Sequence, residues 1–64
     1  MDQYLIDALK ARYEAQMAEA NANVQVYLST PAGIGEHPDI VSAIDTQVEI
    51  YANAKEKLEV IDEF

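Results

Sequence analysis

The residues best suited to chemistry are His37, which is the only histidine of the chain, and its acidic neighbours Glu36 and Asp39. An imidazole beside carboxylates can ligate a metal ion or accept a proton in catalysis. A catalytic zinc ion, however, takes three protein ligands, and metal-binding helical bundles carry Glu-x-x-His pairs, which this sequence lacks. We therefore interpret His37 as a loop residue ahead of a helix and expect no metal site.

Two glycines, Gly33 and Gly35, precede a predicted helix start, as the glycines of phosphate-binding loops do. Such a loop also needs a preceding strand and either a third glycine or a following Lys and Ser/Thr, and none of these is present. The carboxylates of Glu36 and Asp39 would also repel an anion. This segment is therefore predicted to be the corner where the chain reverses.

No serine, threonine or lysine has the neighbours that activate a nucleophile. Ser42 falls in the first turn of a predicted helix, and Lys55 and Lys57 lie among glutamates. We therefore expect a protein that is not an enzyme and that binds neither a cofactor nor an identifiable small-molecule substrate.

The 64-residue chain has no cysteine and carries a net charge of −8, of which residues 1–28 contribute −2 and residues 36–64 contribute −6. Because nucleic acids and anionic lipids are bound through Lys and Arg, this balance argues against direct binding to either. No apolar run approaches the roughly 20 residues that span a bilayer, and no basic region precedes an apolar segment near Met1. We expect a soluble, cytoplasmic protein.

The apolar residues of segment 2–28 recur every three or four positions, which is the spacing of one buried face of a helix. This stripe comprises Ile6, Leu9, Tyr13, Met17, Ala20, Val24 and Tyr27. A second series lies on the opposite side and comprises Ala8, Ala11, Ala15, Ala18 and Ala22. These alanines either permit the close approach of another helix or, as we favour, act as strong helix formers on an exposed face.

Segment 38–62 begins with Pro38 and Asp39, which are residues typical of a helix N-terminus. Its apolar stripe comprises Ile40, Ile44, Val48, Tyr51, Ala54 or Lys55, Leu58 and Ile61. The opposite side is acidic and comprises Asp45, Glu49, Glu56, Glu59 and Glu63. Because negative charge is disfavoured at a helix C-terminus, the acids at the end of this segment predict a frayed last turn unless a cation meets it.

Two helices of matched length joined by connector 29–37 predict an all-α hairpin that forms a single domain, residues 1–64. Antiparallel pairing about Gly33 would place Tyr13 near Tyr51. A hairpin cannot cover both of its apolar stripes, and an uncovered apolar groove marks an interaction surface. We therefore expect self-association, most simply of two copies into a four-helix bundle with two-fold symmetry.

The connector PAGIGEHPDI, followed by AIDTQVEIYANAKEKLEVI, resembles small uncharacterised helical-hairpin proteins of large marine tailed phages, the cyanophage group. The resemblance covers most of the chain. It implies a virus-encoded accessory protein in the cytoplasm of the host cell, and it supplies no catalytic residues.

Two functional hypotheses follow from these patterns. The first is a helical protein–protein interaction or assembly module that associates with itself through the apolar stripes. The alternative is an acidic inhibitor, or nucleic-acid mimic, that uses the acidic side of the second helix to occupy a basic groove on a host or viral enzyme.

Overall fold

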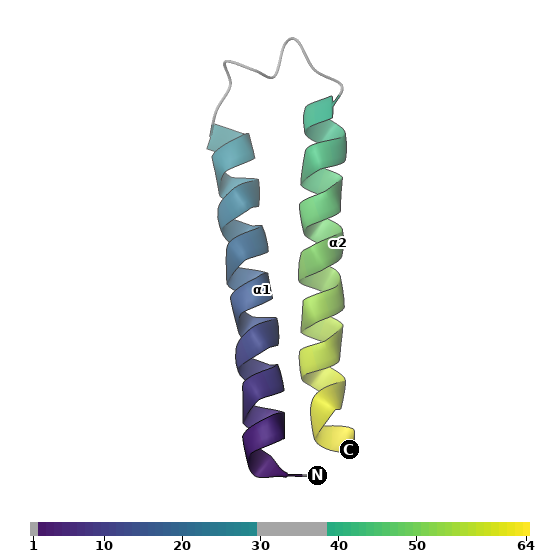
Figure 1. The fold of residues 1–64 in the computed structure, drawn as a ribbon. Coiled ribbons are helices and arrows are strands. Elements are labelled where there is room, and N and C mark those ends of the chain that lie inside the picture. The colour runs from purple at the N-terminus through teal and green to yellow at the C-terminus, as the bar shows by residue number, and fades with distance from the viewer. Residues whose placement is uncertain (1, 30–38) are drawn as a thin grey trace.

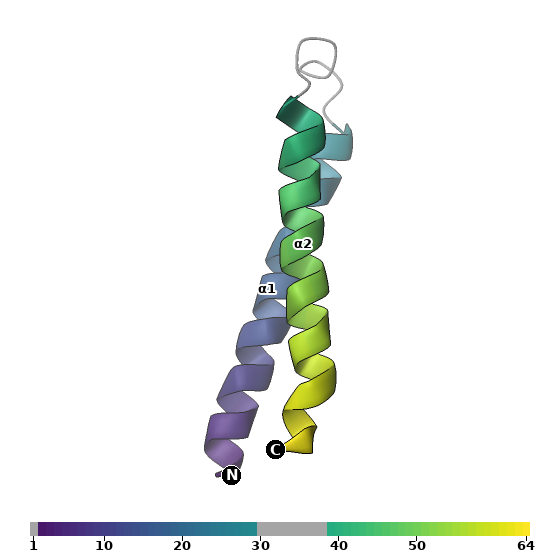
Figure 2. The ribbon, with the colours of Figure 1, turned by 90° about the vertical axis from the view of Figure 1, so that its right-hand side faces the viewer.

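The computed structural model describes residues 2–29 and 39–64, which form two long helices side by side and contain no strand (Figures 1 and 2). Helix α1 spans Gln3–Ser29, helix α2 spans Asp39–Val60, and a short 3-10 helix, η2, spans Ile61–Glu63. The two helices run in opposite directions, so the two ends of the chain lie at the same end of the molecule. The predicted all-α hairpin is confirmed.

Local hydrogen bonds order the structure near both ends of the chain. The backbone N–H of Tyr4 donates to the Oδ1 atom of Asp2 over 2.7 Å, so Asp2 acts as the N-cap of α1. At the other end of the chain, the N–H of Phe64 donates to the carbonyl oxygen of Ile61 over 3.4 Å. Helix α2 therefore ends slightly earlier than predicted, because its last turn tightens from α to 3-10 geometry.

The core lies between the two helices and is small. Four apolar residues of the described chain are buried, and they are Ile6, Ala20, Ala54 and Ile61. Eight more residues of the predicted stripes are half-buried: Leu9, Tyr13, Met17, Val24, Tyr27, Ile40, Ile44 and Leu58. Two stripe residues depart from the prediction, since Val48 is 51% exposed and Tyr51 is 39% exposed.

The predictions made for Gly33, Gly35, His37 and the segment around them fall on residues 30–38, outside the described residues. Among the described helices, none combines the length and the apolar character needed to cross a membrane.

Candidate interaction surface

A pair of amides crosses the seam between the helices. The Nδ2 atom of Asn23 donates a hydrogen bond to the Oε1 atom of Gln47 over 3.1 Å, and both residues are half-buried. A polar pair of this kind is satisfied in only one alignment of the two helices, so it favours one register over its neighbours. The spacing of apolar residues does not identify this pair. The available signal was that Gln47 lies three residues after Ile44, on the inward side of the helix.

Two charged contacts join the helices nearer the chain termini. The Nζ atom of Lys10 lies 2.8 Å from the Oδ1 atom of Asp62. The Nζ atom of Lys57 lies 5.8 Å from the ring centroid of Tyr13, within the range of a cation–π interaction. Both contacts join α1 to the last turns of the chain.

These contacts show that the predicted register was wrong. Tyr13 lies beside Lys57, and Tyr51 lies beside Ala20 and Asn21, so α2 is displaced by about one to two turns from the alignment centred on Gly33. The physical reason is that the apolar spacing fixes which side of each helix faces inward, whereas a shift of one turn leaves that side unchanged. The register depends on the polar contacts.

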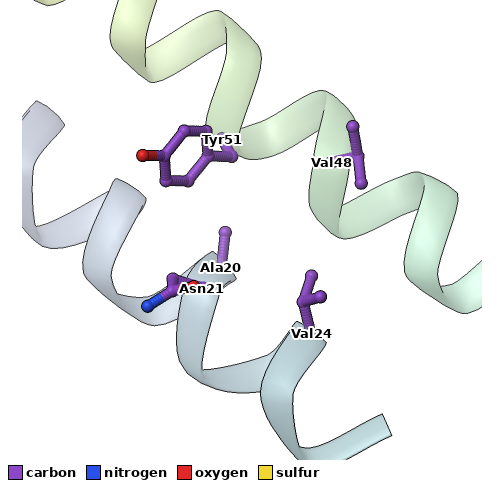
Figure 3. Close-up of a pocket in the computed structure, with 5 residues that line it drawn as sticks. All are labelled: Ala20, Asn21, Val24, Val48 and Tyr51. Carbon is purple, nitrogen blue, oxygen red and sulfur yellow. The ribbon is translucent and has the colours of Figure 1, made fainter. Parts of the chain in front are cut away.

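One side of the hairpin is hollowed between α1 and α2 beside Val48 and Tyr51. The hollow has a volume of about 200 Å³ and is lined by Ala20, Asn21, Val24, Val48 and Tyr51. In Figure 3, Ala20 and Val24 on α1 face Tyr51 and Val48 on α2. None of the lining residues is charged, so the hollow is suited to an apolar partner.

The apolar surface extends from the hollow toward the ends of the helices at Ser29 and Asp39. Leu28 lies one turn after Val24 and is 61% exposed, and Val41 lies two turns before Val48 and is 69% exposed. We call this surface the open face, and its members are Ala20, Asn21, Val24, Leu28, Val41, Val48 and Tyr51. An exposed apolar surface that is continuous over both helices is characteristic of an interaction site.

The acidic side predicted for the second helix lies on the outside of α2. Its five carboxylates are all exposed, and they are Asp45, Glu49, Glu56, Glu59 and Glu63. Their separations of three, four and seven residues place them along one side of the helix. Cations could approach this surface without disturbing the core.

The C-terminal turn is held in place by a lysine from the other helix. Lys10 pairs with Asp62, and the adjacent Ile61 is buried. The fraying expected for a helix end rich in acids is therefore opposed by the ammonium group of Lys10. The hydrogen bond to Asp62 raises the pKa of Lys10 above its ordinary value of 10.5.

A pH titration tests this contact. Because the pKa of Lys10 is raised in the folded state, its stabilising effect is fully present below about pH 10.5 and is lost as the pH rises through the folded-state pKa. We expect the NMR signal of the Ile61 side-chain methyl to shift over that range as η2 loosens. In Asp62→Asn the shift linked to Lys10 should be absent, and an identical titration in both proteins would contradict the assignment.

The described residues contain no group of three or more His, Cys, Asp or Glu side chains placed to hold a metal ion. Ser42 and Lys55, considered above as nucleophiles, are both exposed. The candidate sites of the described residues are therefore the open face and the acidic side of α2.

Comparison with protein-family models, with curated proteins and with solved structures gave no significant match. The resemblance to phage hairpin proteins stays a prediction. The roles of the open face and the acidic side are therefore inferred from the residues that form them.

Proposed function

We propose that this chain is a non-enzymatic helical module that works by self-association, in which two copies form a four-helix bundle with two-fold symmetry. The observation that carries the proposal is the surface of a single hairpin. Its solvent-accessible area is 4838 Å². A compact chain of 7.1 kDa is expected to expose about 4,100 Å².

The excess surface matches the needs of an interface. It amounts to about 700 Å², and each partner in a standard protein–protein interface contributes about 800 Å². The excess arises from the shape of the hairpin, whose Cα atoms extend over 49 × 14 × 11 Å. A second hairpin laid along the first would thicken this rod and remove a comparable area from water.

The open face is the part of this surface best suited to a second copy. None of its seven members is charged, and Asp45 borders it between Val41 and Val48. Its exposed side chains also match the core of other interfaces, in which charged residues are depleted and tyrosine is enriched. Covering it would add Val48 and Tyr51 to the four residues that are buried in the described part of the chain.

Sedimentation equilibrium over a wide concentration range, with circular dichroism on the same samples, tests this proposal. We expect the mass to approach twice the chain mass of 7.1 kDa while the helical signal is retained. A helical protein that sediments at 7.1 kDa at every concentration would contradict it. In that case the open face would have to serve a different protein.

A second candidate function is supported by the five exposed carboxylates on the outside of α2. A row of negative charge along a helix can occupy a basic groove that normally holds a nucleic-acid backbone. This candidate predicts a basic protein partner that is captured from a lysate at low salt and released at high salt.

A matched pair of variants tests the second candidate. The triple variant Glu49→Gln/Glu56→Gln/Glu59→Gln should lose such a partner, while Glu19→Gln, which removes a carboxylate from α1, should retain it. A partner held equally well at high salt, or held by the triple variant, would count against the acidic mimic.

A further inference from the structure

The open face continues toward the chain termini as a charged surface. Glu14 lies seven residues before Asn21 and therefore projects from the same side of α1. Lys55 lies four residues after Tyr51 and projects from the same side of α2. Beyond them the surface ends at the ion pair between Lys10 and Asp62. The half of this side nearer Ser29 and Asp39 is thus mainly apolar, with Asp45 at its border, and the other half carries both signs of charge, including Glu59 one turn after Lys55.

Along the helix axis, the apolar half of α1 lies beside the apolar half of α2, and the charged halves also lie side by side. Lys10 lies level with Asp62, and Asn23 lies level with Gln47, because each pair is in direct contact. Glu14 and Lys55 then lie within about one helical turn of the same height, since each residue rises about 1.5 Å. By the same measure, the exposed side chains of the apolar half occupy similar heights on α1 and α2.

We propose that the second copy seats on the open face with the two-fold axis parallel to the helices, so that α1 of each copy packs on α2 of the other. The ends that carry Ser29 and Asp39 then lie together in both copies. This arrangement rests on the proposed function, and it adds the orientation of the partner. Every helix of the resulting bundle is antiparallel to its neighbours.

In this orientation the apolar half of each copy covers the apolar half of the other, and the charged halves also face each other. Val24 of one copy meets Val48 of the partner copy, and both hollows are covered at once. Near the middle of the helices, Glu14 of one copy opposes Lys55 of the partner copy, and the symmetry creates this pair twice. The charges at this level are therefore complementary across the interface.

The other two-fold arrangement, with the axis perpendicular to the helices and full overlap of the hairpins, is disfavoured. It would lay the apolar half of one copy on the charged half of the other. The ion pair between Lys10 and Asp62 would then lie against the region of Val48 in the partner copy, and it would lose water to an apolar surface. The charge pattern therefore selects the parallel axis.

A mixing experiment with two charge-reversal variants tests the orientation. In Glu14→Lys and in Lys55→Glu, each homodimer would oppose like charges at both symmetric positions. A one-to-one mixture can form a heterodimer in which both positions again carry opposite charges. We expect each variant alone to show a dimer dissociation constant raised roughly tenfold, and the mixture to regain the affinity of the unaltered chain.

Mixing also separates a contact between copies from one within a chain. If Glu14 and Lys55 paired within one hairpin, each variant would carry its own repulsion into the mixture, and no affinity would be recovered. A mixture that associates no better than the separate variants would therefore overturn the proposed orientation. If the unaltered chain is nevertheless a dimer, the proposed function stands and only the orientation is wrong. If the unaltered chain is a monomer, the proposed function and the orientation are both wrong.

The matched control is Glu19→Lys, which introduces the same charge change on another side of α1. Glu19 lies five residues after Glu14, so its side chain points away from the open face. Mixing Glu19→Lys with Lys55→Glu should give no preference for the heterodimer. A preference equal to that of the Glu14→Lys mixture would mean that net charge alone drives the association, and it would overturn the proposal.

Discussion

Replacing Ile44 by aspartate is expected to abolish the cooperative thermal unfolding of the helical hairpin. Ile44 is half-buried on the inward side of α2, and a carboxylate there has no cation among the neighbouring positions of its stripe. Burying an unpaired charge, together with the lost apolar contact, should lower the free energy of unfolding by about 3 kcal/mol or more. A small domain with few buried residues has little stability to lose.

The measurement is a thermal melt followed by circular dichroism at 222 nm. Asn53→Asp is the matched control, because Asn53 is exposed on another side of the same helix and the variant has the same net charge. It should melt close to the unaltered protein, as should Glu56→Gln on the acidic side. If Ile44→Asp melted at the same temperature as Asn53→Asp, the inward stripe of α2 would be wrongly assigned.

Replacing Val48 by aspartate should act on association instead. Val48 is 51% exposed in the single hairpin, so a carboxylate there remains in contact with water until a second copy approaches. In the proposed bundle, two such carboxylates would be desolvated at the centre of the interface. We expect the dimer dissociation constant to rise at least about 100-fold, which corresponds to about 2.7 kcal/mol.

Ile50→Asp provides the control for Val48→Asp. Ile50 is also an exposed apolar residue of α2, at 40% exposure, but it lies two residues further along and projects from a different side of the helix. Sedimentation velocity should show that Ile50→Asp dimerises normally and that Val48→Asp does not. Equal loss of association in both variants would show that the open face is not the interface.

The spacing of apolar residues was sufficient to predict which sides of the helices meet. Ile6, Ala20, Ala54 and Ile61 all belong to the predicted stripes, and all are buried. This success has a simple physical basis, because a period of 3.6 residues leaves one side of each helix apolar and that side must turn away from water. The residue type of Asp39 indicated a helix N-terminus, and α2 begins there, whereas the capping role of Asp2 was not predicted.

The register and the width of the core could not be predicted in the same way. Sliding α2 along α1 by one turn keeps the apolar sides together, and the alignment depends instead on Asn23 with Gln47 and Lys10 with Asp62. These are residues of common types with no motif to identify them. The exposure of Val48 could not be foreseen either, because two helices make contact only along a narrow line and leave the edges of a broad stripe uncovered.

Small-angle X-ray scattering of the unaltered chain over a dilution series tests the central claim most directly, since it reports mass and shape together. The proposed bundle predicts a mass of twice 7.1 kDa at high concentration. Two hairpins of 15.0 Å radius of gyration, packed in parallel at an axial separation of 8–10 Å, should together give a radius of about 16 Å. A mass of 7.1 kDa with a radius near 15.0 Å at every concentration would contradict self-association.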